Sequence, residues 1–351
     1  MQKPFRITVY GAGAIGTTLA AWLTHAGHDV SLLARGENAR QLQQKSIRIQ
    51  SDNKVLLDDT RVRVIETLAA AEDIDLLIIT VKNFHLDACC QDIVDSIGRN
   101  TLVVGLQNGV ENQTILPKYF DRVVYAIINY NAWQSLKAQE LNSDTLNWNV
   151  SVFGPIILGT LNPKMLPVAK DLTALFTGFI RCEFSQSFQD HAHAKLVNNL
   201  ANSVTTIIGN SHREASALKP LQAVLTQLTN EGINTLQAAG IKETKAGPLP
   251  PWSVIRLIKR LPSLLTRFIF KRKMAIVGST SMANDIIARG AGESELESIN
   301  GYLLKLADTH GVDVPYSRGL YQLCQQRFSE EPFRPLSANE LRIFLDGYAQ
   351  G

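Results

Sequence analysis

The chain has 351 residues, of which 45% are hydrophobic and 19% are charged, and its formal net charge is +3. A chain longer than about 300 residues exceeds what one hydrophobic core usually supports, so we expect two domains. The composition is ordinary for a soluble globular protein, and the small net charge points to no particular partner.

The cysteines and the N-terminus bear on the cellular compartment. None of the four cysteines belongs to a CxxC motif or has a histidine at a spacing suited to zinc, so we predict no metal site and a reduced, intracellular protein. The N-terminal MQKPFRITVYGAG runs straight into a strand and a glycine loop, which leaves no room for a signal peptide. We therefore expect a cytoplasmic location.

The first half of the chain alternates short apolar runs with helical patterns. The apolar runs predict strands at 6–10, 29–35, 75–82, 101–109 and 122–132. Because helical patterns separate these strands, they indicate a mostly parallel, doubly wound sheet covered on both faces. From about residue 186 helical periodicity dominates, with helices expected at 188–208, 217–239, 296–310 and 337–348. We predict an α/β domain over 1–185 and an all-α domain over 186–351.

The sequence GAGAIG is a GxGxxG motif between the first predicted strand and a helix predicted over 14–26. Gly11 permits the tight turn, Gly13 lets the backbone approach a pyrophosphate, and Gly16 lets helix and strand pack closely. The helix N-terminus then offers free N–H groups to the phosphates. A purely structural turn is the alternative. We predict a dinucleotide site of the Rossmann type formed by Gly11, Ala12, Gly13, Ala14, Ile15 and Gly16.

The end of the second predicted strand indicates which dinucleotide binds. NAD sites usually place an acid there for the ribose 2′-OH, whereas this chain has Arg35, whose guanidinium can pair with a 2′-phosphate. We therefore expect NADPH. Glu37 leaves NADH open, because a shift of two residues could bring its carboxylate to the ribose. Arg35 could also be an ordinary surface arginine.

Polar residues follow two further predicted strands. Lys82 closes DLLIITVK, and Asn108 lies in the LQNG that closes TLVVGLQNG. Each alone is typical of a strand end or turn. Since ligands bind at the carboxyl ends of strands in open α/β sheets, the two together predict walls of a nicotinamide site.

A lysine and an amide share one face of a predicted helix. Lys195 and Asn199 are four residues apart in HAHAKLVNNLANS. The pKa of a lysine falls readily on burial, which suits it to donate a proton near neutral pH. Asn199 could bind the ammonium or a substrate oxygen. The alternative is a lysine whose stem lies along the helix edge with its charge in water.

Five sequence features closely resemble the ketopantoate reductase (2-dehydropantoate 2-reductase) family. They are GAGAIG at 11–16, VK at 81–82, QNG at 107–109, KLVNN at 195–199 and STSMANDIIARGAGESELESINGY at 279–302, and the tail HGVDVP at 310–315 also matches. The resemblance implies a Rossmann domain joined to a helical domain, with the substrate in the cleft between them. NADPH would transfer a hydride to the carbonyl of a 2-keto acid and give a 2-hydroxy acid. In the family's reaction, 2-dehydropantoate is reduced to pantoate in pantothenate biosynthesis.

The resemblance also assigns roles to residues. The family's catalytic lysine falls on Lys195, which would protonate or polarise the substrate carbonyl, and a family glutamate falls on Glu295, which would hold that lysine charged and oriented. Ser281 matches the substrate-binding serine, and Asp285 matches an acid four residues later. Two further matches would line the active site, Lys82 and Asn108.

Three positions depart from the family pattern, which usually has asparagine there: Gly278, Ser203 and Arg213. A site that loses hydrogen-bonding amides and gains a cation discriminates differently among substrates. The departures therefore favour a substrate other than 2-dehydropantoate, larger or more anionic, as an alternative to the family reaction.

An amphipathic segment over 248–277 also departs from the family pattern. Its part from residue 252 to 277 contains seven basic residues and no acid, which leaves a net charge of about −4 on the rest of the chain. Its charges and Pro262 exclude a transmembrane helix. It could pack into the second domain or a dimer, close as a lid over the site, or lie on a membrane surface.

We expect an enzyme with a small keto acid as its partner. A non-catalytic NADPH sensor is the alternative of another class, against which Lys195 and Glu295 argue. A nucleic-acid binder is not expected, because the basic segment lacks a recognition motif. A monomer and a homodimer are both compatible with the sequence.

Overall fold

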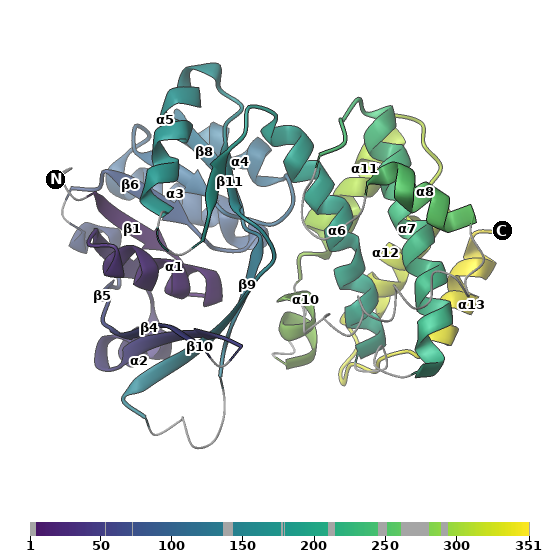
Figure 1. The fold of residues 1–351 in the computed structure, drawn as a ribbon, viewed down its shortest axis with the longest axis horizontal. Coiled ribbons are helices and arrows are strands. Elements are labelled where there is room, and N and C mark those ends of the chain that lie inside the picture. The colour runs from purple at the N-terminus through teal and green to yellow at the C-terminus, as the bar shows by residue number, and fades with distance from the viewer. Residues whose placement is uncertain are drawn as a thin grey trace. The chain divides into compact units, whose positions relative to one another are not determined.

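The computed structural model describes residues 5–52, 54–71, 73–135, 143–176, 178, 180–209, 215–244, 251–260, 281–288 and 294–350. The chain forms two compact units, residues 1–188 and 189–351 (Figure 1). This division concerns compactness, so the assignment of 1–185 to cofactor binding and of 186–351 to substrate chemistry stays a prediction.

The first unit is built on an eight-stranded sheet with the order β12-β11-β8-β7-β6-β1-β2-β5. All neighbouring strands are parallel except the β8–β11 pair, which is antiparallel. This confirms the mostly parallel sheet expected from the sequence. The strands are β1 (Arg6–Tyr10), β2 (Asp29–Leu33), β5 (Arg63–Ile65), β6 (Leu76–Ile79), β7 (Leu102–Gly105), β8 (Arg122–Ile127), β11 (Ile156–Gly159) and β12 (Cys182–Phe184).

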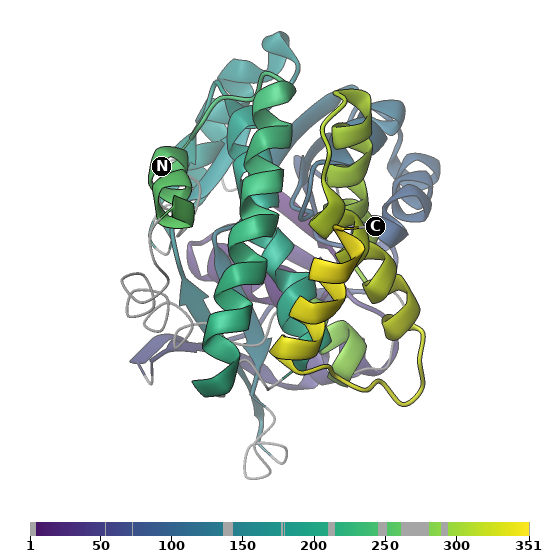
Figure 2. The same ribbon diagram turned by 90° about the vertical axis from the view of Figure 1, so that its right-hand side faces the viewer.

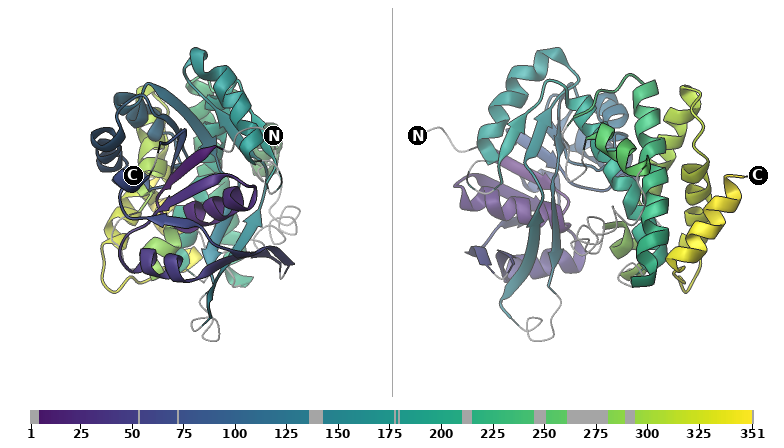
Figure 3. Two further views of the ribbon diagram at one scale, coloured as in Figure 1. Left: turned by 90° about the vertical axis from the view of Figure 1, so that its left-hand side faces the viewer. Right: turned by 45° about the vertical axis from the view of Figure 1, so that its right-hand side comes forward.

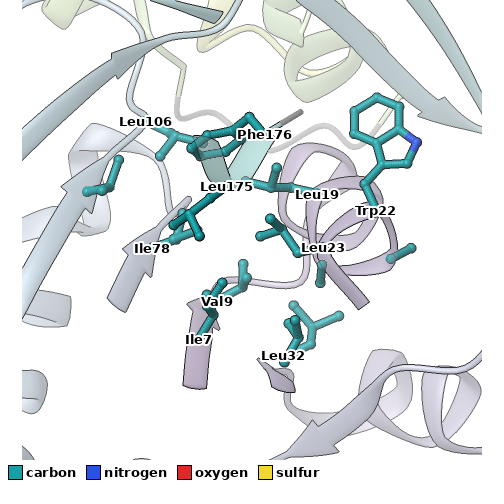
Figure 4. Close-up of a cluster of buried hydrophobic side chains, with 14 of the residues drawn as sticks. Ile7, Val9, Leu19, Trp22, Leu23, Leu32, Ile78, Leu106, Leu175 and Phe176 are labelled. Carbon is teal, nitrogen blue, oxygen red and sulfur yellow. The ribbon is translucent and has the colours of Figure 1, made fainter. Parts of the chain in front are cut away.

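Helices cover this sheet, and their apolar faces form its core. They are α1 (Ala14–His25), α2 (Gly36–Gln44), α3 (Leu86–Ile97), α4 (Asn112–Tyr119) and α5 (Leu166–Asp171). Leu19 and Leu23 of α1 lie over Ile7 and Ile78 of the central strands, with all four fully buried (Figure 4). Because β6 is apolar on both faces, the sheet needs cover on both sides.

A second, four-stranded sheet was not predicted from the sequence. Its order is β4-β3-β10-β9, and its strands extend from the main sheet as long ribbons (Figure 3). The apolar run 122–132, predicted as one strand, instead supplies β8 to one sheet and β9 to the other. The strands are β3 (Ser46–Ser51), β4 (Lys54–Thr60), β9 (Tyr130–Gln134) and β10 (Thr145–Val152).

The second unit is helical, as expected, and α7 is its central helix. Its elements are α6 (Phe188–Ile208), α7 (Leu218–Ala238), α8 (Trp252–Arg260), α10 (Ser281–Ala283), α11 (Tyr302–Thr309), α12 (Pro315–Phe328) and α13 (Ala338–Tyr348). Figure 2 shows α12 and α13 beside α7. Gly232 of α7 lets α6 approach closely, since a side chain there would press on Val197 and Leu200.

The helix predicted over 296–310 is interrupted. A π-helical turn, Glu297–Gly301, precedes α11, and α12 was not predicted as a helix. A π turn places one extra residue in the helix and is frequent at functional sites.

Among the described helices, none combines the length and the apolar sequence that crossing a membrane requires.

The first part of the basic segment packs into the helical unit. In α8, Trp252 and Ile255 are buried in the core of this unit, and Arg256 donates a hydrogen bond to Gln237 of α7. This agrees with the packing interpretation for residues 252–260. The remainder of the segment, 261–277, lies outside the described residues.

Candidate functional site

The glycine loop has the geometry of a phosphate-binding turn between β1 and α1. Gly11 has φ +116°, which a residue with a side chain rarely adopts. A Cβ on Gly16 would lie 1.9 Å from the backbone oxygen of Gly11, so only glycine permits this approach of helix to loop. Gly13 has open space where its side chain would be. The loop therefore presents bare backbone on the side where a pyrophosphate would approach.

The N-terminus of α1 faces the same loop. Gly13 is the N-cap, so no side chain satisfies the first N–H groups of the helix. These N–H groups and the positive end of the helix dipole suit a phosphate. The residues present thus fit the phosphates of a dinucleotide.

Thr80 holds this loop in place and was not recognised from the sequence. Its hydroxyl donates to the backbone oxygen of Gly11 at 2.7 Å, and its backbone N–H donates to Tyr10 at 3.0 Å. On the other side, the Asn38 amide donates to the oxygen of Ala12 at 2.7 Å. Thr80 follows β6 directly, so its position at the carboxyl end of a strand could have identified it from the sequence.

Lys82 and Asn108 lie in the loops that follow two adjacent parallel strands, β6 and β7. The two loops are joined, because the Asn83 amide donates to the backbone oxygen of Asn108 at 2.6 Å. The Gln107 amide adds bonds to the oxygens of Ile79 and Val81. The structure therefore brings both predicted residues to the edge of the sheet that also carries the glycine loop.

Arg35 and Glu37 differ in what they offer a cofactor. Arg35 is the N-cap of α2, and its side chain is 63% exposed. The Glu37 carboxylate contacts Arg40 and Gln41 of its own helix, at 3.4 and 3.3 Å. Glu37 thus contacts residues of its own helix, whereas the contacts of Arg35 come from other elements.

Lys195 and Glu295 come together in the helical unit. Lys195 projects from α6 and, as a whole residue, is only partly covered. Burial of its ammonium group nevertheless lowers the pKa to about 8, and the charge of Glu295 opposes this shift because it raises the pKa. The Glu295 side chain is 2% exposed and precedes the π turn. An acid whose charge acts on a lysine with this pKa favours the protonated form of a proton donor near neutral pH.

Asn199 lies one turn beyond Lys195 on α6, as its spacing predicted. Its amide nitrogen is buried and, among the described residues, has no hydrogen-bond acceptor. A buried donor without a partner costs about 1–3 kcal/mol, which a bound oxygen atom would recover. Asn199 is therefore suited to bind a substrate oxygen close to Lys195.

Ser203 does not replace the amide that the family pattern has at its position. Its side chain is 0% exposed, its hydroxyl donates to the oxygen of Leu200 at 2.9 Å, and it accepts from the Asn300 amide at 3.1 Å. Ser203 thus joins α6 to the π turn. Sequence reasoning did not foresee Asn300, which is also buried.

Other predicted positions are less informative. Ser281 begins α10, but its side chain lies outside the described residues, as do Gly278 and Arg213 entirely. Asp285 is buried in a neighbouring π-helical turn, Asn284–Ala288. In the described part of the chain, no group of three or more His, Cys, Asp or Glu is placed to hold a metal ion.

His193 was also missed. Its Nδ1 lies 2.8 Å from the oxygen of Gln189, which requires Nδ1–H to donate, so Nε2 accepts from the Tyr302 hydroxyl at 3.0 Å. Burial lowers the pKa of this imidazole, which favours its neutral form. The bond joins α6, two residues before Lys195, to the start of α11.

Comparison with known proteins decides the family. The ketopantoate reductase PanE/ApbA model matches residues 7–142, and the model of that family's C-terminal part matches residues 187–328. The chain belongs to the ketopantoate reductase PanE/ApbA family. The resemblance to this family, stated from the sequence motifs, is thereby confirmed.

Individual relatives cover nearly the whole chain at low identity. A 2-dehydropantoate 2-reductase of Archaeoglobus fulgidus is 25% identical over 91% of this chain and 96% of its own. That of Vibrio cholerae is 24% identical over 90% of this chain and 95% of its own. These relatives carry the name of one reaction.

Solved structures share the fold. A PanE/ApbA family ketopantoate reductase from Ralstonia eutropha JMP134 has a TM-score of 0.67 at 22% identity, covering 98% of this chain and 99% of its own. A D-mandelate dehydrogenase with NADH and anilino(oxo)acetate has a TM-score of 0.68 at 19% identity, covering 95% and 98%. One fold therefore accommodates enzymes named for different substrates.

Proposed function

We propose that this protein reduces a 2-keto acid to a 2-hydroxy acid with NADPH, and that 2-dehydropantoate is its substrate. The observation that carries the proposal is that the buried Glu295 acts electrostatically on Lys195, whose ammonium has its pKa lowered to about 8 by burial. A sensor that only binds a dinucleotide has no need of a proton donor held in this way. Membership in the family and the names of its curated relatives support the same reaction.

The roles of the residues follow from the chemistry. A dinucleotide bound at the glycine loop would supply the hydride. Lys195 donates a proton to the carbonyl oxygen as negative charge develops there. Glu295 keeps the lysine oriented and favours its charged form. The Asn199 amide donates to an oxygen of the substrate.

A second candidate is the same reaction on a different 2-keto acid. Ser203 supports it, because its hydroxyl is buried and engaged with Leu200 and Asn300 and offers the substrate no amide. A pocket that lacks one hydrogen-bonding amide loses discrimination for the group which that amide would bind.

Turnover by the purified protein separates these candidates. NADPH consumption is followed spectrophotometrically with 2-dehydropantoate and, in parallel, with larger and more anionic 2-keto acids. We expect the highest kcat/KM with 2-dehydropantoate. Turnover only with another acid would favour the second candidate, and binding of NADPH without any turnover would favour the sensor.

The rate of reduction should depend on pH in a defined direction. Lys195 must be protonated to donate, so with a pKa of about 8 the value of kcat/KM should be level below pH 8 and fall above it, by about tenfold per pH unit. In Glu295→Gln the charge that raises the lysine pKa is lost, and the fall should begin at a lower pH. A rate that rises through pH 8 would contradict Lys195 as the acid.

A further inference from the structure

Arg35 is held by groups from two other elements of the first unit. Its Nη2 donates to the Tyr10 hydroxyl and to Oδ2 of Asp92, both at 3.2 Å. Tyr10 is the last residue of β1, and its hydroxyl donates to the same Asp92 oxygen at 2.6 Å. Asp92 lies on α3. The guanidinium carbon also lies 5.8 Å from the centre of the Tyr10 ring.

The charges of this cluster nearly cancel. Burial and the hydrogen bond to Asp92 raise the pKa of the Tyr10 phenol, so it stays neutral and donates. Burial also raises the pKa of the Cys89 thiol, the neighbouring group on α3, so it adds no charge. The cluster thus contains one cation and one anion, Arg35 and Asp92.

The position of this pair matters for the choice of cofactor. Arg35 follows β2, where a dinucleotide-binding sheet places the group that reads the ribose 2′ substituent. A 2′-phosphate carries between one and two negative charges near neutral pH and would meet the carboxylate of Asp92 beside the guanidinium it binds. With the Asp92 side chain 46% exposed, the repulsion is moderate and screened by salt.

We propose that Asp92 sets cofactor selectivity by partly neutralising Arg35, which reduces the preference for a dinucleotide with a 2′-phosphate over one without it. The inference rests on the proposed binding of a nicotinamide dinucleotide at the glycine loop. Arg35 attracts the phosphate, and Asp92 limits that attraction. The advantage of NADPH over NADH is therefore smaller than Arg35 alone would give.

Binding measurements test this without relying on catalysis. The affinities of NADP⁺ and NAD⁺ are measured by isothermal titration calorimetry for the wild type and for Asp92→Asn, which keeps an acceptor for Tyr10. We expect NADP⁺ to bind about 3- to 10-fold more tightly to the variant, the gain shrinking at high salt, and NAD⁺ to change less than about twofold. Asp95→Asn is the matched control, because Asp95 lies on the same helix and contacts Gln91 instead.

The outcomes are distinct. Weaker NADP⁺ binding by Asp92→Asn would overturn the proposal, since Asp92 would then position Arg35 for the phosphate. An equal change in Asp95→Asn would also overturn it, because general charge rather than this contact would be responsible. If the wild type bound neither dinucleotide, the proposed function itself would fail. The outcomes above, in which the wild type binds both dinucleotides, would overturn only the inference about Asp92.

Discussion

Replacing Lys195 with alanine should lower kcat by about 10²- to 10⁴-fold, the usual contribution of a positioned acid. The reason is that burial and Glu295 hold this ammonium with a pKa of about 8, so that it can donate near neutral pH. Affinity for NADP⁺ should change little, since the glycine loop belongs to the other compact unit. Steady-state kinetics and calorimetric titration measure the two quantities separately.

Controls distinguish lost chemistry from lost folding. Lys195→Arg keeps a cation beside Glu295 but has a pKa too high to give up a proton readily, so we expect a folded and nearly inactive variant. Lys219→Ala removes an exposed lysine of the same unit and should keep wild-type kcat. A Lys195→Ala variant with close to wild-type kcat would remove Lys195 from the mechanism.

Replacing Arg35 with alanine should weaken NADP⁺ binding by about 10- to 100-fold, as expected for loss of a charge-assisted bond to a phosphate. The loss includes a second effect, because Asp92 is then left without its cation and repels the phosphate. NAD⁺ has no 2′-phosphate, so its affinity should change less than about threefold. Titrations of both dinucleotides give the comparison directly.

Arg99→Ala is the control for this variant. Arg99 is an exposed arginine of the same unit that contacts the backbone oxygen of Lys118 and the carboxylate of Asp121, and its removal should leave the ratio of the two affinities unchanged. Equal losses of NADP⁺ and NAD⁺ in Arg35→Ala would contradict recognition of a 2′-phosphate. Combining Arg35→Ala with Asp92→Asn should then recover part of the lost NADP⁺ affinity.

Local patterns in the sequence predicted the parts of the fold that depend on local physics. Apolar runs and helical periodicity placed β1, α6, α7 and α13 within a residue or so of their observed bounds. The glycine loop was predicted because its conformation excludes side chains at Gly11 and Gly16. In such cases the residue type and its spacing contain the whole physical reason.

Features that depend on distant partners could not be predicted in this way. Asn129 interrupts the run 122–132 that was expected to form one strand, and its amide donates to the oxygen of Pro155, where the chain passes from one sheet to the other. The bond of Arg35 to Asp92 spans 57 residues, and that of His193 to Tyr302 spans 109. Periodicity within a window holds no information about such pairs.

The resemblance to a family identified site residues that helical spacing alone could not single out. From the helix alone, Lys195 was as readily a surface lysine as an acid, and only the match to the family singled out Glu295. The structure adds the burial of Glu295 and its electrostatic effect on Lys195. It also shows that Ser203 is a buried contact with Asn300. The catalytic and binding roles of these residues remain proposals.

The most direct test of the account follows the hydride itself. The purified wild-type protein is given 2-dehydropantoate and NADPH that is deuterated at the hydride-donating carbon, and the product is examined by NMR spectroscopy. We expect pantoate with deuterium on the carbon that bore the carbonyl, formed in an amount equal to the NADPH consumed. NADPH that binds but transfers no deuterium to this or any other 2-keto acid would contradict the assignment of a reductase.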